Sequence, residues 1–370
     1  MREVFIVAGE VSGDLHAAAV ATALRRLRPD LALAGIGSAR MEAAGVRLME
    51  RSEQLAAFGL VEVIRQVPHH WRLLRAITAR IRSGEIALLV LLDYPGFNLK
   101  LAAAAHAARV PVLYYITPQV WAWGAGRIAT MRRTITKAAP ILPFEEAMLR
   151  DAGIDATFVG HPLLDYAAQI PDRATARARL GIDAGARVLA LFPGSRVGEV
   201  ARHLDDFVAT ARLMEERYPG LRVLVSVAPG MTIDTARCPY PQVHEASYDV
   251  LRAADAALCK SGTTTLEAAV AGCPLVICYR TNALTWIIGR PLLRTKFIGL
   301  VNIVAGREVT HEYLQDSMTP TALAAALGPL LDPGSPERQA MLADLAEVHA
   351  RLGTPGAAER VAAMASALVP

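Results

Sequence analysis

The chain has 370 residues, more than one hydrophobic core usually holds, and this length predicts two domains. With 53% hydrophobic and 20% charged residues, the composition is typical of a globular protein and excludes an intrinsically disordered chain. A net charge of +4 is too small for a general nucleic-acid binder, although it is compatible with anionic ligands or an anionic membrane surface.

Short apolar runs alternate with helical patterns along the whole chain. In chain order, the strand-like runs are EVFIVA (3–8), IALLVLL (86–92), VPVLYY (110–115), APIL (139–142), RVLALF (187–192), RVLVSV (222–227), AALC (256–259) and PLVIC (274–278). Such alternation predicts an α/β protein with two parallel, doubly wound sheets, which bind ligands at the carboxyl ends of their strands. We therefore expect the functional residues on the loops that follow strands.

Two turn-rich segments indicate where the domains end. GHP at 160–162 precedes a helical pattern and then a new strand at Arg187, and DPGSP at 332–336 introduces a final pair of helical patterns. The predicted organisation is an N-terminal domain at 1–165, a second domain at 166–335 and C-terminal helices at 336–370.

Signals for secretion and for membrane spanning are missing from the sequence. The opening MREVFIVAGE does not have the charged region and apolar region of a signal peptide, and the longest uncharged run, 110–126, is interrupted by prolines. The four cysteines, at 238, 259, 273 and 278, form no C-x-x-C pair, which fits a reducing compartment. We expect a cytoplasmic protein whose membrane contact, if any, is peripheral.

Several familiar nucleotide and hydrolase motifs are incomplete. The segment 9–14 follows the first strand but lacks the Gly-Lys-Ser/Thr of a P-loop, and Gly35-Ile-Gly37 does not complete G-x-G-x-x-G. The segment 194–198 is not a G-x-S-x-G elbow, and no D-x-D pair is available to hold a metal beneath a diphosphate. We therefore expect an anion site without a metal or a cofactor.

Two loops of the second domain suit an anion. KSGTTTLE (260–267) joins a strand to a helix, so its free N–H groups and its Ser and Thr hydroxyls can bind a phosphate, and Glu267 can accept from a ribose diol. A plain helix cap with Glu267 in a capping box would use the same residues. Pro193-Gly194-Ser195-Arg196 follows another strand, and Arg196 is either a diphosphate ligand or a surface turn residue.

The first domain offers candidates of a different kind. Asp93 directly follows an apolar strand, where it can cap the next helix or act as a base. Trp121 and Trp123 either pack beneath their loop or line a sugar or acyl pocket. From 63 to 84 there are five arginines and no acidic residue, so Val67, Trp71 and Leu74 belong to an interfacial helix that contacts anionic lipid or to a helix that faces the core.

Taken together, these segments closely resemble the bacterial lipid-A-disaccharide synthase family of GT-B glycosyltransferases. The matching motifs run nearly from end to end: AGEVSGD (8–14), FGLVEV (58–63), DYPGFN (93–98), PQVWAW (118–123), LPFE (142–145), GHP (160–162), PGSR (193–196), SGTTTLE (261–267) and NIVAGRE (302–308). The resemblance implies two Rossmann-like domains that face a central cleft.

The resemblance also implies the reaction and its location. The expected enzyme transfers 2,3-diacylglucosamine from UDP-2,3-diacylglucosamine to 2,3-diacylglucosamine 1-phosphate, inverts the anomeric centre, and forms the β-1,6 lipid A disaccharide and UDP. It would act peripherally on the cytoplasmic face of the inner membrane of a Gram-negative bacterium. A homodimer that exchanges C-terminal segments is implied as well, although a tail helix that crosses back onto the first domain would have the same sequence pattern.

Roles for individual residues follow from the same resemblance. Asp93 matches the family's proposed base, and Arg196 and Asn302 match residues needed near the donor. The implied donor-binding set is Gly194, Ser195, Arg196, Ser261, Gly262, Thr263, Thr264, Glu267 and Asn302. The implied acceptor-side set is Gly9, Glu10, Ser12, Asp14, Trp121, Trp123 and Arg127.

Some positions depart from the family pattern, and two other functions stay open. Gly124 stands where Arg is frequent, so an anion contact there would pass to Arg127 or be lost, and Lys260 stands where a small residue is usual. A UDP-sugar 2-epimerase on a related scaffold would need neither an acyl-binding surface nor a base at Asp93. A non-catalytic binder of lipid or nucleotide sugar is the third candidate.

Overall fold

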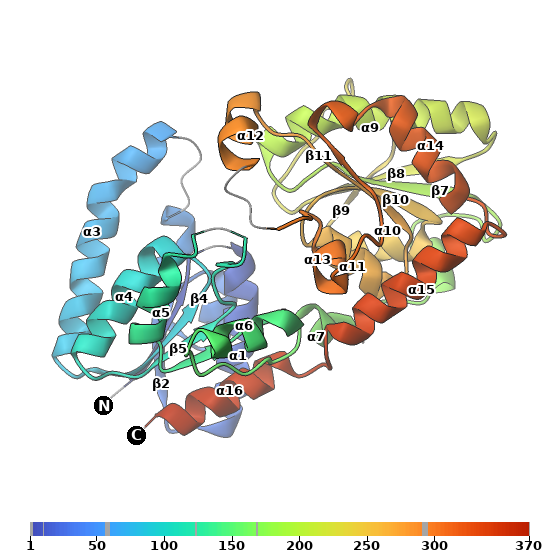
Figure 1. Cartoon of the computed structure of the whole chain (residues 1–370). Helices are drawn as coiled ribbons and strands as arrows, with labels where there is room; N and C mark the ends of the chain where they lie inside the picture. Colours follow the sequence, from blue (N-terminus) through green and yellow to red (C-terminus); the bar gives the residue numbers. More distant parts are fainter. Residues whose placement is uncertain are drawn as a thin grey trace. The chain divides into compact units, whose positions relative to one another are not determined.

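The computed structural model describes residues 3–9, 11–55, 60–122, 124–167, 169–290 and 295–369. The chain forms two compact units, each with its own sheet (Figure 1). The first unit is Met1–Asp165 together with Gly353–Pro370, and the second is Tyr166–Leu352.

The first unit is built on a six-stranded parallel sheet with the strand order β3-β2-β1-β4-β5-β6. Its strands are β1 (Glu3–Ala8), β2 (Ala32–Gly37), β3 (Arg47–Arg51), β4 (Ile86–Leu92), β5 (Val112–Tyr115) and β6 (Lys137–Ala139). Its helices are α1 (Val11–Leu27), α2 (Ala39–Ala43), α3 (Leu60–Arg82), α4 (Pro95–Ala107), α5 (Arg127–Thr134), α6 (Pro143–Asp151) and α16 (Ala357–Leu368), with the 3₁₀ turn η1 (Ser52–Gln54) after β3.

Helices cover both faces of this sheet, which explains why β4 is apolar and buried at all of its positions. Successive strand residues point to opposite faces. Phe5 and Val7 join the core beneath α3, α4 and α5, whereas Val4 and Ile6 join the core beneath α1 and α16.

The second unit repeats the same arrangement, with the strand order β12-β11-β10-β7-β8-β9. Its strands are β7 (Val188–Phe192), β8 (Arg222–Val227), β9 (Gln242–His244), β10 (Ala256–Lys260), β11 (Leu275–Tyr279) and β12 (Glu312–Leu314). Its helices are α8 (Arg173–Arg179), α9 (Val197–Arg217), α10 (Ser247–Ala253), α11 (Thr264–Ala271), α12 (Ala283–Gly289), α13 (Leu300–Ala305), α14 (Pro320–Leu330) and α15 (Pro336–Arg351), with the 3₁₀ turn η3 (Gln315–Ser317). The short helix α7 (Leu163–Ala167) lies at the division between the units.

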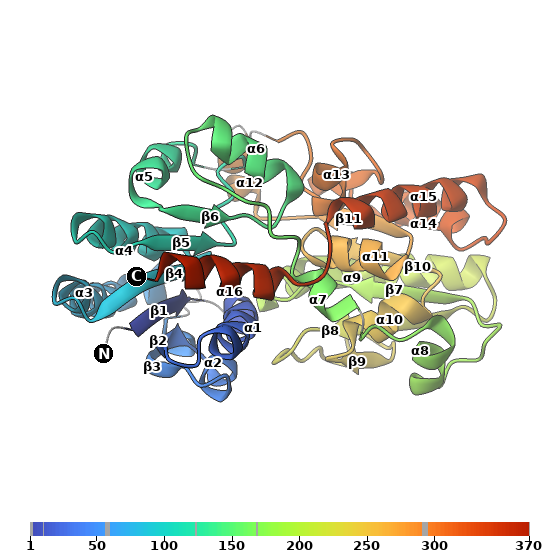
Figure 2. The same ribbon diagram turned by 90° about the horizontal axis from the view of Figure 1, so that it is seen from below.

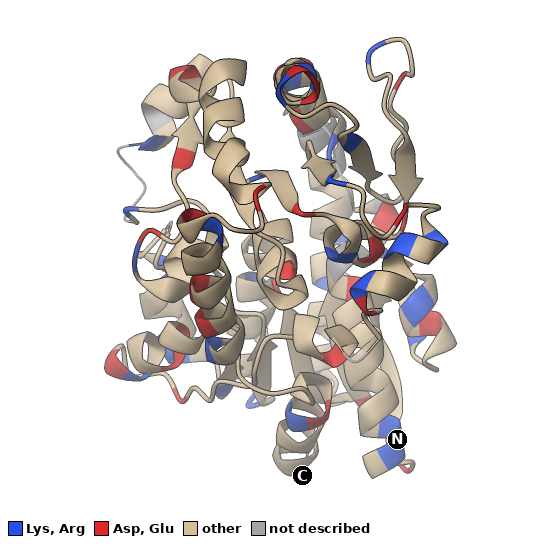
Figure 3. Ribbon diagram, turned by 90° about the vertical axis from the view of Figure 1, so that its right-hand side faces the viewer, with Lys and Arg blue, Asp and Glu red and all other residues tan. Residues whose placement is uncertain are grey.

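The two sheets confirm the predicted fold class of two doubly wound α/β domains. One face of the second sheet packs against α9 and α14 through residues such as Phe207, Leu323 and Leu327. Acidic and basic residues are interspersed over the helices in Figure 3, in keeping with the small net charge. Within the described part of the chain, no helix is long and apolar enough to cross a membrane.

The last two helices belong to different units. The helix α15 packs against α11 and α13 of the second unit, whereas α16 returns to the first unit and lies beside α1 (Figure 2). The Asp165 carboxylate caps α16, because it accepts hydrogen bonds from the N–H groups of Gly356 (2.6 Å), Ala357 (3.1 Å) and Ala358 (3.3 Å). The segment 336–370 is therefore shared between the units within one chain.

Candidate functional site

The predicted site loops follow the strands at which each sheet reverses its order. In the first unit these neighbours are β1 and β4, and in the second they are β7 and β10. Ala8 pairs with Leu92, and Phe192 pairs with Cys259, so each pair of loops starts side by side. Such reversal points are where open α/β sheets bind ligands.

In the first unit, Asp93 lies in a strained and well-anchored turn. Asp93 and Tyr94 have φ values of 43° and 47°, in the left-handed region that residues other than glycine rarely adopt. The Asp93 N–H donates to Ile116 O (3.2 Å), and its carbonyl accepts from the Tyr114 hydroxyl (2.6 Å) and from Asn98 Nδ2 (2.7 Å). These bonds hold the exposed Asp93 at the end of β4, and strain of this kind is typical of functional sites.

Tyr94 connects this turn to the loop after β1 and to α3. A Cβ atom at Gly9 would lie 2.5 Å from the Tyr94 ring, so the close approach of the two loops requires glycine there. The Tyr94 hydroxyl is 2.6 Å from His70 Nε2, and the rings of Tyr94 and Phe97 are 5.7 Å apart. No motif identifies His70, because the pattern of α3 does not indicate which loop this side chain reaches.

Asp14, which we expected on the acceptor side, is buried and makes contacts within the first unit. Its carboxylate accepts hydrogen bonds from the N–H groups of Ser38 (2.6 Å), Arg40 (3.3 Å) and Met41 (3.3 Å), at the start of α2. It therefore joins the first turn of α1 to the start of α2. Glu10, the Ser12 side chain and Trp123 lie outside the described residues.

Trp121 packs against the start of α6. Its Nε1 donates to Glu145 Oε1 (2.9 Å), and its ring meets Phe144 edge to face at 5.3 Å. Glu145 is 1% exposed, and burial raises the pKa of its carboxyl to about 7. Arg127 is exposed at the start of α5, and a Cβ atom on Gly124 would be 3.3 Å from its guanidinium, so the Arg127 side chain lies beside Gly124.

The apolar residues of α3 divide between the core and the solvent. Leu73, Ile77 and Ile81 are buried in the core, and Leu74 packs partly against it. Val67 is 45% exposed and Trp71 is 50% exposed, with Lys100 Nζ 4.9 Å from the Trp71 ring. The helix thus faces the core and also presents large apolar side chains to the outside.

In the second unit, Glu199 joins the two candidate anion loops. Its Oε2 accepts from the Ser195 N–H (3.1 Å), and its Oε1 lies 2.9 Å from Lys260 Nζ and 3.8 Å from Arg196 Nη1. The turn needs a glycine at 194, where φ is 137° and a Cβ atom would lie 2.7 Å from Glu199 Cβ. The Arg196 side chain is 65% exposed and accessible to an anion.

At the other loop, α11 begins without a side-chain cap. Thr263 is the N-cap residue and makes no side-chain cap bond, so the capping box with Glu267 does not form. Thr265 Oγ1 donates back to Gly262 O (2.9 Å). Among the described residues, the N–H groups of Gly262, Thr263 and Thr264 have no hydrogen-bond acceptor, as expected at the first turn of a helix.

Glu267 lies one turn further along α11. Burial raises the pKa of its carboxyl to about 7, and no group of the described residues donates a hydrogen bond to it. The charge of Glu267 and burial both raise the pKa of the Tyr248 hydroxyl, with burial the larger cause. A carboxylate in this position can accept hydrogen bonds from a bound diol.

Asn302 is fully buried and uses its whole amide within the second unit. Its Nδ2 donates to Thr310 O (2.8 Å) and Glu312 Oε1 (2.9 Å), while its Oδ1 accepts from the N–H groups of Val309 (2.8 Å) and Thr310 (3.1 Å). Glu312 also accepts from the N–H groups of Ile298 and Gly299, both at 2.9 Å. Sequence reasoning missed Glu312, which no motif marks.

Ser261 completes this network, because its Oγ donates to Ile298 O at 2.9 Å. Ser261 and Asn302 are therefore brought together through the Ile298–Gly299 backbone and Glu312, without a direct bond between them. Ser261 and Asn302 therefore belong to one hydrogen-bonded network, whereas Glu267 accepts no hydrogen bond from the described residues.

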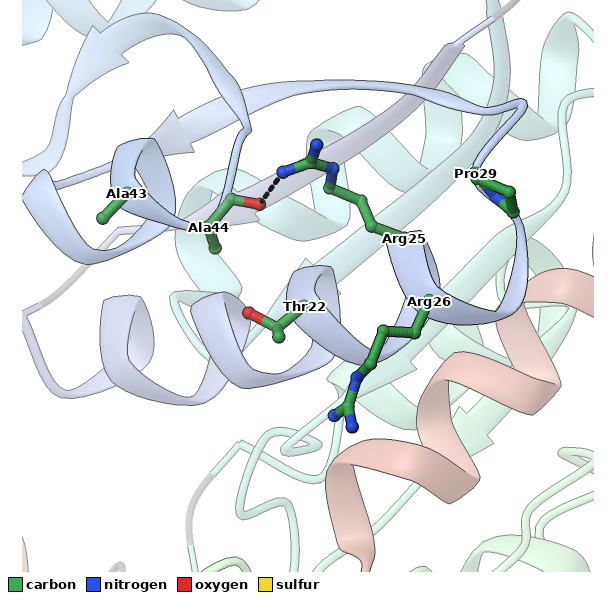
Figure 4. Close-up of a pocket in the computed structure, with 6 residues that line it drawn as sticks. All are labelled: Thr22, Arg25, Arg26, Pro29, Ala43 and Ala44. Atoms are coloured by element: carbon green, nitrogen blue, oxygen red, sulfur yellow. Dashed lines mark hydrogen bonds between the residues drawn. The ribbon is translucent and has the colours of Figure 1, made fainter.

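A hollow of about 350 Å³ lies elsewhere in the first unit (Figure 4). Arg25 Nη1 donates to Ala44 O across it (3.1 Å), and Arg26 pairs with Glu359 (3.6 Å). Since α1 starts at the carboxyl end of β1 and runs back along the sheet, its last turn with Arg25 lies near the amino ends of the strands. This hollow does not belong to the candidate site.

Comparison with known proteins identifies the family. A family model described as lipid-A-disaccharide synthetase matches residues 4–359. The lipid-A-disaccharide synthase of Myxococcus xanthus (strain DK1622) is 42% identical over 379 residues, which cover 99% of this chain and 97% of the relative.

Solved structures show the fold. The calicheamicin glycosyltransferase CalG4 has a TM-score of 0.62 at 14% identity and matches 99% of this chain and 98% of its own. The UDP-GlcNAc 2-epimerase from Neisseria meningitidis bound to UDP-GlcNAc has a TM-score of 0.59 at 10% identity, with 98% of each chain covered. The fold is GT-B. The chain belongs to the lipid-A-disaccharide synthase family, whose members are glycosyltransferases of lipid A biosynthesis.

Proposed function

We propose that the enzyme transfers 2,3-diacylglucosamine from UDP-2,3-diacylglucosamine to 2,3-diacylglucosamine 1-phosphate with inversion at the anomeric carbon. The acceptor 6-hydroxyl oxygen forms the new β-1,6 bond as the bond to the UDP oxygen breaks, so UDP leaves and the hydroxyl proton passes to a base. The observation that carries this proposal is the pair of loops at β7 and β10, which Glu199 joins into one cationic site beside the start of α11, where three N–H groups have no acceptor among the described residues.

The second unit is assigned to the donor. The exposed Arg196 guanidinium and the N–H groups at the start of α11 would stabilise the charge that grows on the departing diphosphate. Glu267, whose carboxylate accepts no bond from the described residues, would accept from the ribose diol. Since its amide is fully used, Asn302 would act by holding the segment that carries Ile298, to which Ser261 is bonded.

The first unit is assigned to the acceptor, with Asp93 as the base. Asp93 is exposed at the carboxyl end of β4, where its backbone is anchored on both sides. A carboxylate held in this way can take the proton from a hydroxyl without a large reorganisation of the chain. Arg127 is the candidate for the acceptor phosphate, and Gly9 permits Tyr94 to approach the loop that carries the other acceptor-side candidates.

We also assign α3 to the membrane. Val67 and Trp71 are exposed and lie on a helix with five arginines between residues 63 and 84, which suits an interface with anionic lipid. On this proposal, the enzyme acts peripherally on the cytoplasmic face of the inner membrane of a Gram-negative cell, where both acylated substrates would be found. The homodimer implied by the resemblance stays a prediction that sedimentation would test.

The decisive experiment incubates the purified chain with both substrates and follows the products by mass spectrometry. We expect disaccharide and UDP in equal amounts, and proton NMR of the product should show the β-1,6 linkage. An epimerised donor formed without acceptor would instead identify a UDP-sugar 2-epimerase. If both ligands were bound and recovered unchanged, the chain would be a non-catalytic binder.

A further inference from the structure

Lys260 is a largely buried cation in the middle of the donor-side loops. It is the last residue of β10, and its side chain is only 15% exposed. Lysine side chains are seldom buried to this extent unless they are paired. The pairing, and the position of the ammonium beside α11, give Lys260 a role that the family motif does not contain.

The partner of Lys260 is Glu199, whose side chain is 11% exposed and whose Oε1 lies 2.9 Å from the ammonium. Burial alone would raise the pKa of Glu199, but the bonds from Lys260 and the Ser195 N–H outweigh it, and the pKa falls below its ordinary value. Glu199 is therefore ionised at neutral pH. Its charge anchors the Lys260 ammonium at the point where the two loops meet.

The anchored ammonium lies directly beside the start of α11. A Cβ atom on Gly262 would be 3.5 Å from Lys260 Nζ, so the absence of a side chain at 262 leaves the ammonium open toward that loop. The Tyr279 ring is 5.8 Å away, at cation–π distance. An ammonium has three N–H donors, and the carboxylate of Glu199 does not exhaust them.

The local charges leave an excess of positive charge at this point. Arg196 and Lys260 face the single carboxylate of Glu199. The neighbouring His203 is neutral, because burial lowers its pKa and its Nε2 accepts from the Arg280 N–H while Nδ1 bonds to Glu199 O. One carboxylate thus holds two cations, an arrangement suited to a ligand with more than one negative charge.

We propose that Lys260 is a further donor-binding residue, whose ammonium contacts the diphosphate of the UDP-sugar. The Glu199 carboxylate holds this ammonium in place. This inference rests on the proposed function, since it takes the two loops to be the UDP site. A small residue, which is more usual in the family pattern at this position, could not make this contact.

The experiment measures the affinity of the full-length chain for UDP and for uridine by calorimetry. In Lys260→Met, we expect UDP affinity to fall by about tenfold or more, as for the loss of a charge-assisted hydrogen bond, while uridine affinity stays unchanged. Lys260→Arg should keep most of the UDP affinity. The control is Arg237→Met, which removes a cation from the exposed pair with Asp205 in the same unit and should change neither affinity.

Other results would overturn either the Lys260 contact alone or the proposed UDP site as well. Equal loss of UDP and uridine affinity in Lys260→Met, or no loss of either, would overturn the diphosphate contact. Failure of the unaltered chain to bind UDP would overturn the proposed function and this inference with it. If Lys260→Met does not fold because Glu199 is left buried and unpaired, the double variant Lys260→Met/Glu199→Gln removes the whole pair, and the same difference between UDP and uridine is expected of it.

Discussion

Asp93 combines a carboxylate with a left-handed backbone conformation. Its φ of 43° would strain most side chains, yet aspartate and asparagine tolerate this region several times more often than other residues. An aspartate at position 93 therefore suits both the backbone of the turn and the proposed proton transfer. A substitution that tests the base must therefore keep the turn.

Asp93→Asn meets this condition, since the amide tolerates the same backbone but cannot take a proton. We expect turnover to fall by a factor on the order of 10² to 10⁴, the range for loss of a general base. UDP affinity should stay unchanged, because Asp93 lies in the first unit and the donor candidates in the second. Steady-state kinetics and calorimetry measure the two quantities. If Asp93→Asn kept the normal turnover rate, Asp93 would not be the base.

Glu145 shows how a buried carboxyl links stability to pH. Its pKa is raised by burial from 4.5 to about 7, so between these values the native chain holds a proton that the unfolded chain has lost. Its contribution to the free energy of unfolding is therefore fully present below about pH 4.5 and declines as the pH rises toward 7. The raised pKa corresponds to a difference on the order of 3 kcal/mol.

Glu145→Gln should remove this dependence while it keeps an acceptor for the Trp121 indole. Relative to the unaltered chain, the variant should gain about 1–3 kcal/mol of unfolding free energy between pH 4.5 and pH 8. Urea unfolding at the two pH values measures the difference between the two proteins, so that other titrating groups cancel. The same difference at both pH values would contradict a raised pKa.

The helix α3 contributes side chains to the core of the first unit and also presents apolar side chains to the solvent. Its inner face contributes Leu73, Ile77 and Ile81 to the core, and His70 bonds to Tyr94 beside Asp93. Its outer face presents Val67 and Trp71. If the outer face of α3 contacts lipid, the same helix also supports the turn that carries the proposed base Asp93, through the bond between His70 and Tyr94.

The double variant Val67→Ser/Trp71→Ser should weaken binding to vesicles of anionic lipid without loss of folding, because both side chains are about half exposed. Vesicle co-sedimentation measures the binding, and circular dichroism checks the fold. As a matched control on the same helix, Ile77→Ser should unfold the first unit, because Ile77 is fully buried. Unchanged vesicle binding in the double variant would show that these side chains do not contact lipid.

Sequence patterns predict the elements of this protein better than the partners of its side chains. Continuous apolar runs mark most of the central strands, such as β4, because burial on both faces requires hydrophobic residues, but no predicted run marks β2, β3, β9 or β12. The motifs likewise locate the loops after β4, β7 and β10. Glu199, Glu312 and His70 were not assigned roles, because their bonds join segments that are distant along the chain or lie on an unmarked helix face. Asn302 shows the same limit, since its motif does not indicate that its amide is used internally.

The two units have separate cores, but the C-terminal segment of the chain belongs to both of them. Each unit has buried clusters made of its own strands and helices. The first unit is closed by α16, whose Val361 and Ala365 are fully buried and whose N-terminus is capped by Asp165. Proteins with several cores often unfold in more than one step. We therefore expect the units to respond separately to a substitution and to a ligand.

Asp165→Ala should destabilise the first unit by about 1–2 kcal/mol, the usual effect of removing an N-cap. UDP should stabilise the second unit, because a ligand that binds only the folded state raises its unfolding free energy, by about 2.7 kcal/mol at a hundredfold excess over its Kd. Differential scanning calorimetry with and without UDP would resolve the two effects: the substitution lowers one transition, and UDP raises the other. Asp172→Ala, which removes the cap of α8 in the second unit, is the matched control and should lower the UDP-sensitive transition instead. A single transition that moved with every change would contradict independent units and would show that α16 couples the two cores.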